Sequence, residues 1–188
     1  MTQASAWVLV ALGANLGDPW GQLRAARAAL EARLGPSSGA SVGSPTEASS
    51  ARASSIWRSR PLDCPPDSPD FLNAVLAFPI TVAASAEAML SILQELERAF
   101  GRGANGARNA PRTLDLDLLL FGDLMQADRS CVLPHPRALQ RRFVVEPAAE
   151  ILPELIWPGT CRSLAELCEA LRDDREQADT VRASRQWT

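Results

Sequence analysis

Apolar and polar positions alternate along the chain in patterns that predict a succession of strands and helices. Residues 7–12 form a short apolar run that is typical of a buried strand, and Gly13 ends it. Asp18 and Pro19 then supply an N-cap and a first helical position. Apolar residues follow at helical spacing as far as Gly35, so the pattern predicts a helix over this stretch.

The same pattern predicts three more strands and a second long helix. The strands are expected at residues 53–60, 72–78 and 113–121. The helix is expected to follow an N-cap at Ser85 and to end at Gly101, with its apolar residues on one face. Four prolines lie between the first two of these strands and indicate a stiff loop, because proline fixes φ and lacks a backbone donor.

The order of these elements indicates the fold class. A β-α-β-β-α-β succession predicts an α+β protein with a ferredoxin-like core, in which a mainly antiparallel sheet carries helices on one face. Ser163 and Glu166 have the spacing of a capping box, so a C-terminal helical extension is expected over residues 160–188. Since no linker-like segment separates the elements, the 188 residues are expected to form a single domain.

Composition excludes several classes of protein and of chemistry. Apolar residues make up 46% of the chain and charged residues 22%, which is typical of a soluble globular protein. No apolar run reaches the roughly 18 residues of a membrane span, and the N-terminus lacks a signal-peptide pattern, so we expect a cytoplasmic protein that binds no membrane. All 19 basic residues are arginine, and the lack of lysine excludes a Walker-type phosphate loop and Schiff-base catalysis.

The uneven distribution of charge indicates where a ligand binds. The whole chain has a net charge of −3, yet residues 101–145 carry seven arginines against four aspartates. A local excess of arginine in an acidic protein favours a focused anionic ligand and argues against nucleic-acid binding.

The sharpest candidate site is a pair of aspartates in the last predicted strand. Because side chains alternate along a strand, Asp115 and Asp117 are expected on one face, with the neighbouring leucines on the other. Two adjacent carboxylates repel each other, and Mg²⁺ would relieve this while leaving positions for water and phosphate oxygens. Alternatively, the two side chains are merely solvated on an exposed face, or one of them forms an ion pair with Arg112.

Phosphates could bind beside these aspartates only with the help of cations. Arginines precede and follow the strand, at positions 102, 108, 112, 137, 141 and 142. Residues 101–106 match G-x-G-x-x-G, but they follow a helix rather than a strand, so a dinucleotide fingerprint is rejected. The glycine-rich loop over residues 101–110 is expected to be a lid that carries Arg102 over phosphates, or else an ordinary helix-to-strand loop.

Four other residues are candidates for a functional role, and for each of them a purely structural role is the alternative. Phe71 and Phe143 adjoin polar segments and could clamp a flat heterocycle between them, or pack in the core. His135 lies between two prolines and could contact the ligand, or be a surface residue. Glu97 is predicted in the last turn of its helix, where a carboxylate is disfavoured, so it has a role outside the helix or is simply tolerated.

Five motifs together resemble a known family. L-G-A-N-L-G-D at residues 12–18, P-D-F-L-N-A at 69–74, G-R at 101–102, P-R-T-L-D-L-D at 111–117 and L-P-H-P at 133–136 come in the order seen in 6-hydroxymethyl-7,8-dihydropterin pyrophosphokinases of folate synthesis. The resemblance covers about residues 7–158. It departs from the family's usual pattern at Ala104, Asn109, Ala110 and Pro136.

The resemblance implies an ATP-dependent enzyme of ferredoxin-like fold. It would transfer the β,γ-diphosphate of ATP to the hydroxymethyl oxygen of the dihydropterin and release AMP. Asp115 and Asp117 would hold two Mg²⁺ ions, and Arg102 and Arg112 would neutralise charge as the bond to the α-phosphate breaks. The only partners expected are these two small molecules, and we expect a monomer that binds neither nucleic acid nor membranes.

The resemblance also implies two sets of substrate contacts. The ATP-binding set comprises Gln94, Glu97, Arg112, Leu118, His135 and Arg141. The pterin-binding set comprises Ser59, Arg60, Leu62, Phe71, Asn73, Asp115 and Phe143, with the phenylalanines stacked on the ring and backbone groups near residues 59–62 reading its edge. Two alternatives stay open: a non-catalytic module that senses a nucleotide or pterin, and a metal-dependent nucleotidyl transferase that releases diphosphate.

Overall fold

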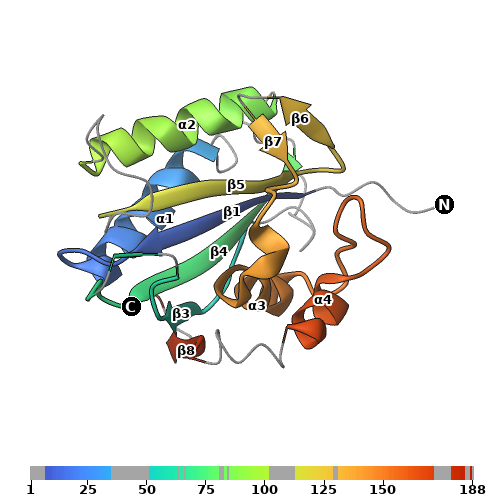
Figure 1. Ribbon diagram of the computed structural model, residues 1–188. Coiled ribbons are helices and arrows are strands. Elements are labelled where there is room, and N and C mark those ends of the chain that lie inside the picture. The colour runs from blue at the N-terminus through green and yellow to red at the C-terminus, as the bar shows by residue number, and fades with distance from the viewer. Residues whose placement is uncertain are drawn as a thin grey trace.

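The protein is described by a computed structural model, which is drawn in Figure 1. The residues that it describes are 7–34, 51–62, 64–65, 67–80, 83, 85–101, 113–128, 131–171, 179–184 and 187.

A single antiparallel sheet forms the centre of the molecule. Its strands are β1 (Trp7–Ala14), β2 (Arg52–Ala53), β3 (Ile56–Ser59), β4 (Phe71–Pro79), β5 (Asp115–Phe121) and β8 (Val181–Ser184). They lie in the order β5-β1-β4-β3-β8, while the short β2 pairs with β4, and each pairing is antiparallel. The predicted α+β class and antiparallel sheet are confirmed.

Helices α1 (Pro19–Leu34) and α2 (Ala86–Ala99) cover one face of the sheet. Each begins at the cap expected from the sequence: Asp18 Oδ1 accepts a hydrogen bond from Gly21 N at 3.0 Å, and Ser85 Oγ accepts one from Ala88 N at 3.2 Å. Even-numbered side chains of β1, among them Val8 and Val10, pack in this layer. The two predicted helices are therefore confirmed.

The opposite face of the sheet is covered as well, by α3 (Arg142–Ile151) and α4 (Leu164–Ala170). Figure 1 shows α2 on one side of the sheet and α3 on the other. Because both faces are buried, the central strands are apolar on both, and Leu9 packs under α3 while Val8 packs under α1 and α2. The expectation of helices on one face only was therefore wrong. Pro147 inside α3 and the lack of a side-chain cap at Arg141 explain why the pattern did not predict this helix.

The predicted strand over residues 53–60 is divided into β2 and β3. Ser54 Oγ accepts a hydrogen bond from Val75 N at 3.0 Å. A side-chain oxygen therefore takes the place of a backbone carbonyl in the hydrogen bonding between the strands. Ser55 donates through its backbone N and its Oγ to Glu150 at 3.1 and 2.5 Å, which draws the chain toward α3.

The C-terminal part of the chain contains both expected and unexpected elements. The capping box predicted for α4 is confirmed, since Ser163 Oγ accepts from Glu166 N at 3.2 Å and Glu166 Oε2 accepts from Ser163 N at 2.8 Å. The extension is not helical throughout, because β8 follows α4 and joins the sheet beside β3. The pattern also missed the hairpin of β6 (Gln126–Asp128) and β7 (Cys131–Leu133). Among the described residues, no helix is long and apolar enough to cross a membrane.

Candidate active site

The two candidate aspartates lie together on β5, at the edge of the main sheet. Asp115 and Asp117 are half-buried, whereas Leu116 and Leu118 between and after them are buried under the α1 and α2 layer. The expected division of this strand into a carboxylate face and a leucine face is confirmed. On the neighbouring β1, Asp115 is paired with Gly13 and Asp117 with Ala11. These small neighbours leave space above the sheet next to both carboxylates.

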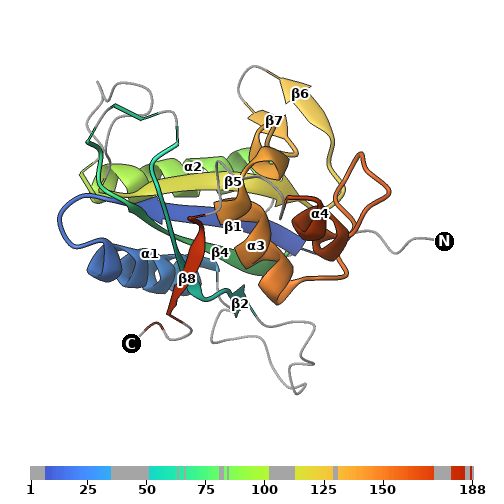
Figure 2. The same cartoon turned by 60° about the horizontal axis from the view of Figure 1, so that its bottom comes forward.

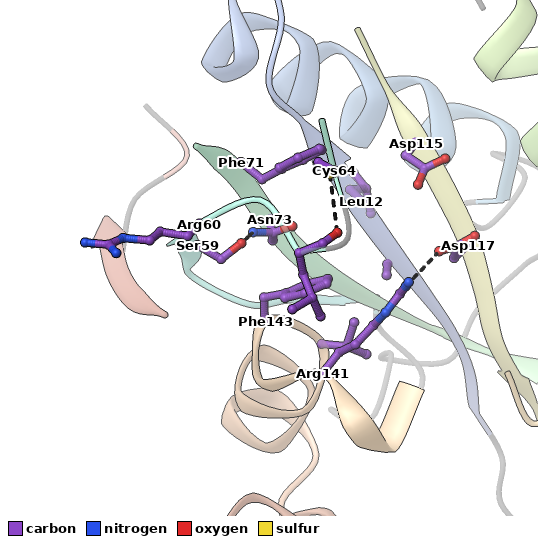
Figure 3. A pocket seen from close by; sticks show the side chains of 14 residues that line it. Leu12, Ser59, Arg60, Cys64, Phe71, Asn73, Asp115, Asp117, Arg141 and Phe143 are labelled. Atoms are coloured by element: carbon purple, nitrogen blue, oxygen red, sulfur yellow. Dashed lines mark hydrogen bonds and ion pairs between the residues drawn. The ribbon is translucent and has the colours of Figure 1, made fainter. Parts of the chain in front are cut away.

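That space is a cavity of about 690 Å³, part of it open to solvent, which we call the first cavity. Its floor is the sheet, and its walls come from the loop after β3 and from the start of α3 (Figure 3). The residues that line it include the whole predicted pterin set: Ser59, Arg60, Leu62, Phe71, Asn73, Asp115 and Phe143.

Two aromatic side chains and an amide give the first cavity its chemistry. Phe71 of β4 and Phe143 of α3 lie on opposite sides of it (Figure 3). The buried Asn73 donates from Nδ2 to Ser59 Oγ at 3.0 Å, which fixes the orientation of its amide. Its Oδ1 lies toward Gly13, where an added Cβ would be 3.6 Å away. The cavity can therefore hold a flat ring between two aromatic faces and offer polar groups to its edge.

A second cavity of about 1220 Å³, also partly open to solvent, lies around the edge of β5, between α2 and β7. Four residues of the predicted ATP set line it: Gln94, Glu97, Leu118 and His135. Asp117 lines both cavities, so its carboxylate is at the place where they meet. Two ligands, one in each cavity, could therefore react with each other beside Asp117.

A hydrogen bond explains why a carboxylate, that of Glu97, lies near the end of α2. Its side chain is 3% exposed, and Oε1 accepts a hydrogen bond from Leu116 N at 3.0 Å. On its outer side, an edge strand has backbone N–H groups that no neighbouring strand can accept from. When such an N–H group is buried, it needs another hydrogen-bond acceptor. Glu97 supplies this acceptor and so attaches α2 to the strand that carries both aspartates.

His135 is held in a fixed orientation beside the second cavity. Its backbone N donates to Leu119 O at 2.8 Å, and its Nδ1 accepts from Arg137 N at 3.3 Å. Burial lowers the pKa of His135 below its ordinary value; Asp117 acts in the opposite direction, and Arg141 and Arg137 lower the pKa further. The ring is therefore neutral near pH 7.

Arg141 lies in the first cavity, although it was expected among the ATP contacts. Its guanidinium is 3.9 Å from Asp117 Oδ2 and stacks on the Phe143 ring, with 5.5 Å between Cζ and the ring centroid. It therefore stands beside the meeting point of the two cavities. Arg102 and Arg112, together with the loop over residues 101–110 expected to act as a lid, lie outside the described residues apart from Gly101.

The carboxylate pair fits Mg²⁺. Among the described residues, no group of three or more His, Cys, Asp or Glu side chains is placed to hold a metal ion. Mg²⁺ in phosphate-transfer sites commonly uses only one or two carboxylates and completes its shell with water and phosphate oxygens. Asp115 and Asp117 meet that requirement, since both border the first cavity and Asp117 also borders the second.

Some lining residues were not named from the sequence. Ala11 and Gly13 form the floor of the first cavity beside the aspartates, and Val144 adjoins Phe143. Gly13 belongs to the L-G-A-N-L-G-D motif, which could have indicated it. Cys64 of the first cavity and Cys131 of the second have no signal in the sequence, because a lone cysteine does not reveal its neighbours.

Comparison with known proteins gives a consistent result. The model of the 7,8-dihydro-6-hydroxymethylpterin-pyrophosphokinase (HPPK) family matches residues 9–153. Two relatives are described as 2-amino-4-hydroxy-6-hydroxymethyldihydropteridine pyrophosphokinases. The one from Pseudomonas aeruginosa is 37% identical over 87% of this chain and 90% of its own length, and the one from Haemophilus influenzae is 32% identical over 88% and 93%. For a third, from Synechocystis, the match is 36% identical but covers only 63% of this chain and 58% of that protein.

Solved structures share the fold. A crystal structure of an HPPK-DHPS protein in complex with substrates is similar over 96% of this chain, with a TM-score of 0.69 and 11% identity. The crystal structure of wild-type Plasmodium falciparum HPPK-DHPS with SDX-DHP gives a TM-score of 0.67 and 9% identity over the same share. This chain spans about half the length of those two proteins, 47% and 48%.

Proposed function

The chain belongs to the 7,8-dihydro-6-hydroxymethylpterin-pyrophosphokinase family and is an ATP-dependent diphosphokinase of folate synthesis; we propose that its two cavities are the binding sites of the two substrates. The pterin occupies the first cavity and ATP the second, and the β,γ-diphosphate passes to the hydroxymethyl oxygen with release of AMP. The single observation that carries this proposal is the position of Asp117, which lines both cavities.

The first cavity is suited to a pterin. Phe71 and Phe143 stack on the two faces of the ring, and Asn73 meets its polar edge through Oδ1. Backbone groups of residues 59–62 complete the edge contacts, since the side chain of Arg60 extends away from the cavity (Figure 3). With the ring held in this way, the hydroxymethyl group points toward Asp115 and Asp117.

The second cavity and the aspartates are suited to a nucleotide. Gln94, Leu118 and the neutral His135 contact ATP, while Glu97 is held by its bond to Leu116 N. Asp115 and Asp117 would hold two Mg²⁺ ions. When bound, these ions would offset the negative charge of the phosphates.

Arginines supply the remaining positive charge. Arg141, beside Asp117, contacts ATP where the two cavities meet. We assign Arg102 and Arg112 to the charge that develops as the bond to the α-phosphate breaks. No protein nucleophile is required, because the reaction depends on positioning and on electrostatic stabilisation.

The strand order supports the finer fold assignment, a ferredoxin-like split βαβ arrangement. In the unit β1-α1-β3 the two strands lie on either side of β4, and in the unit β4-α2-β5 they lie on either side of β1. Each unit is therefore split by a strand of the other. We also propose a single domain and a cytoplasmic monomer whose partners are the two small molecules.

The decisive experiment measures the nucleotide product. The protein is incubated with ATP, Mg²⁺ and 6-hydroxymethyl-7,8-dihydropterin, and AMP and pterin diphosphate are quantified by chromatography. Equal amounts of the two products are expected. ADP as the product would contradict the proposal, and release of free diphosphate would identify a nucleotidyl transferase. Binding of Mg-ATP without AMP at saturating pterin would identify a sensor.

A further inference from the structure

The C-terminal end of the described chain lies against β3, the strand that leads into one wall of the first cavity, residues 59–62. We call residues 179–184 and Trp187 the C-terminal strap. Within it, β8 pairs with β3, so that Arg182 is opposite Trp57 and Val181 is opposite Arg58. Figure 2 shows β8, in red, at the border of the sheet. The strap is outside residues 9–153, the part that the family model matches.

An ion pair joins the strap to the loop after β3. Arg60 Nε is 2.9 Å from Asp179 Oδ2. Figure 3 shows the Arg60 side chain extending away from the first cavity toward β8. Arg60 therefore borders the cavity on one side and is held by the strap on the other.

A small cavity of about 280 Å³, part of it open to solvent, lies between the strap and the wall of the first cavity that residues 59–62 form. Asp179 and the buried Thr180 line it together with Pro61. Its remaining lining residues, Ser59, Arg60, Leu62 and Phe143, also line the first cavity. The two cavities thus share four lining residues, so a displacement of the strap would be passed on to residues of the proposed pterin site.

The strap is also connected to α3, which carries Phe143. Glu150 of α3 accepts a hydrogen bond from Trp57 Nε1 at 3.1 Å and lies 3.6 Å from Arg182 Nη2. Arg182 stacks over the Trp57 ring, with 5.1 Å between Cζ and the ring centroid. At the other end, Trp187 Nε1 donates to Ser54 O at 2.8 Å. The strap therefore contacts both elements that wall the first cavity.

We propose that the C-terminal strap is a positioning element for pterin binding: Asp179 and Thr180 hold residues 59–62 at the correct distance from Phe143. The inference rests on the proposed function, because it assumes that the first cavity binds the pterin. Asp179 and Thr180 are positioning residues, since they act on the substrate through the wall and do not touch it.

The test is a charge exchange across the Arg60–Asp179 pair in the full-length protein. Asp179→Arg places two arginines side by side, and we expect the KM for the pterin to rise roughly threefold to tenfold, a range typical of an exposed charge pair turned repulsive. The kcat and the KM for ATP are expected to stay within about twofold, since the second cavity is remote from the strap. The double variant Arg60→Asp/Asp179→Arg should return the pterin KM toward the wild-type value.

A matched control separates positioning from general stability. Arg33 and Glu95 form an ion pair of 2.8 Å between α1 and α2, and Glu95 is as exposed as Asp179. Glu95→Arg should leave both KM values unchanged. Thr180→Leu, which overfills the small cavity, should raise the pterin KM without the charge change.

Two results would overturn the inference. One is an unchanged pterin KM in both Asp179→Arg and Thr180→Leu. The other is a rise of both KM values in parallel with a lower melting temperature, which would mean that the strap only stabilises the fold. If wild-type protein released no AMP, the proposed function would fail, whereas the pterin dissociation constant measured by calorimetry in the same variants would still decide the role of the strap.

Discussion

At the scale of single residues, the charge of Asp117 is the centre of the site. Its carboxylate lines both cavities and lies 3.9 Å from the guanidinium of Arg141. Without an adjacent cation, a phosphate chain next to this carboxylate would meet repulsion of several kcal/mol, about 3 kcal/mol for each unit pair at roughly 6 Å in an effective dielectric near 20. We therefore expect nucleotide binding to depend on divalent ions.

Asp117→Asn tests this dependence. The substitution keeps the shape of the side chain but removes a charged oxygen ligand, so we expect Mg²⁺-dependent ATP binding to weaken by roughly tenfold or more. Calorimetric titration of ATP at several magnesium concentrations measures the effect. Asp123→Asn, at an exposed turn outside both cavities, is the control and should bind as the wild type does. An affinity that Asp117→Asn leaves unchanged at every magnesium concentration would remove this residue from the metal site.

His135 predicts a pH dependence of stability. Burial lowers its pKa in the folded protein below the ordinary value of 6.5. The unfolded chain therefore takes up a proton near pH 6.5, while the folded protein does so only at lower pH. By linkage, the stabilising contribution is complete above pH 6.5 and is lost as the pH falls from 6.5 toward the folded-state pKa.

Urea denaturation of wild type and His135→Gln between pH 5 and 8 measures this contribution. The wild type should lose stability below pH 6.5 more steeply than the variant, which has no group that titrates at this position. Identical slopes for the two proteins would show that His135 does not titrate differently in the folded and unfolded states.

At the scale of elements, the position of β5 depends on a contact made by a helix. The Leu116 N–H at the edge of the sheet is satisfied by Glu97 of α2 and not by another strand. Thr113 Oγ1 also donates to Phe100 O at 2.8 Å, at the end of the same helix. The aspartate strand is therefore held between β1 on one side and α2 on the other.

Glu97→Ala should destabilise the protein because it leaves the buried Leu116 N–H without its acceptor. The expected loss is about 1–3 kcal/mol of the free energy of unfolding. Glu97→Gln keeps an oxygen acceptor and should lose less. Chemical denaturation measures both, and Glu95→Ala, on the exposed side of the same helix, should change stability by less than about 1 kcal/mol. Equal losses in Glu97→Ala and Glu95→Ala would count against the role of this hydrogen bond.

At the scale of the whole molecule, the two cavities meet at one edge strand because both faces of the sheet are covered. Helix α2 borders the second cavity at the edge of β5, and α3 closes the first cavity from the opposite face. A substrate in either cavity binds the folded chain only, since the unfolded chain has no such walls. Ligands should therefore raise the stability of the folded state by mass action.

Magnesium removal provides a whole-molecule prediction. ATP at about 100 times its dissociation constant, with magnesium, should stabilise the protein by about 2.7 kcal/mol and raise its melting temperature. EDTA in excess should abolish the shift, because the aspartates would then repel the phosphates. The matched comparison is ATP without magnesium. An equal rise of the melting temperature with ATP alone would show that nucleotide binding does not require the metal.

The sequence predicts the local part of this protein well. The helix caps at Asp18 and Ser85, the capping box at Ser163 and the shared face of Asp115 and Asp117 are all found in the structure. Each depends on residues fewer than five positions apart, so steric and hydrogen-bonding preferences within one turn or strand are sufficient to determine it.

The features that the sequence did not predict depend on distant partners. The hydrogen bond from Leu116 N to Glu97 spans 19 residues, and the one from Ser55 to Glu150 spans 95. Helix α3 has an internal proline and no cap, and it is helical because it packs on the second face of the sheet. Strand β8 is similarly defined by its pairing with β3.

The sequence by itself thus determined which residues could do the chemistry: a carboxylate pair, a set of arginines and two candidate aromatic rings, in motifs of one family. Only the tertiary structure decided that the two aspartates, the two phenylalanines and Arg141 border two cavities that meet at Asp117, and that the C-terminal strap lies against one wall. The physical reason is that local preferences act over a few residues, whereas a cavity is formed by surfaces that chain closure brings together from distant segments.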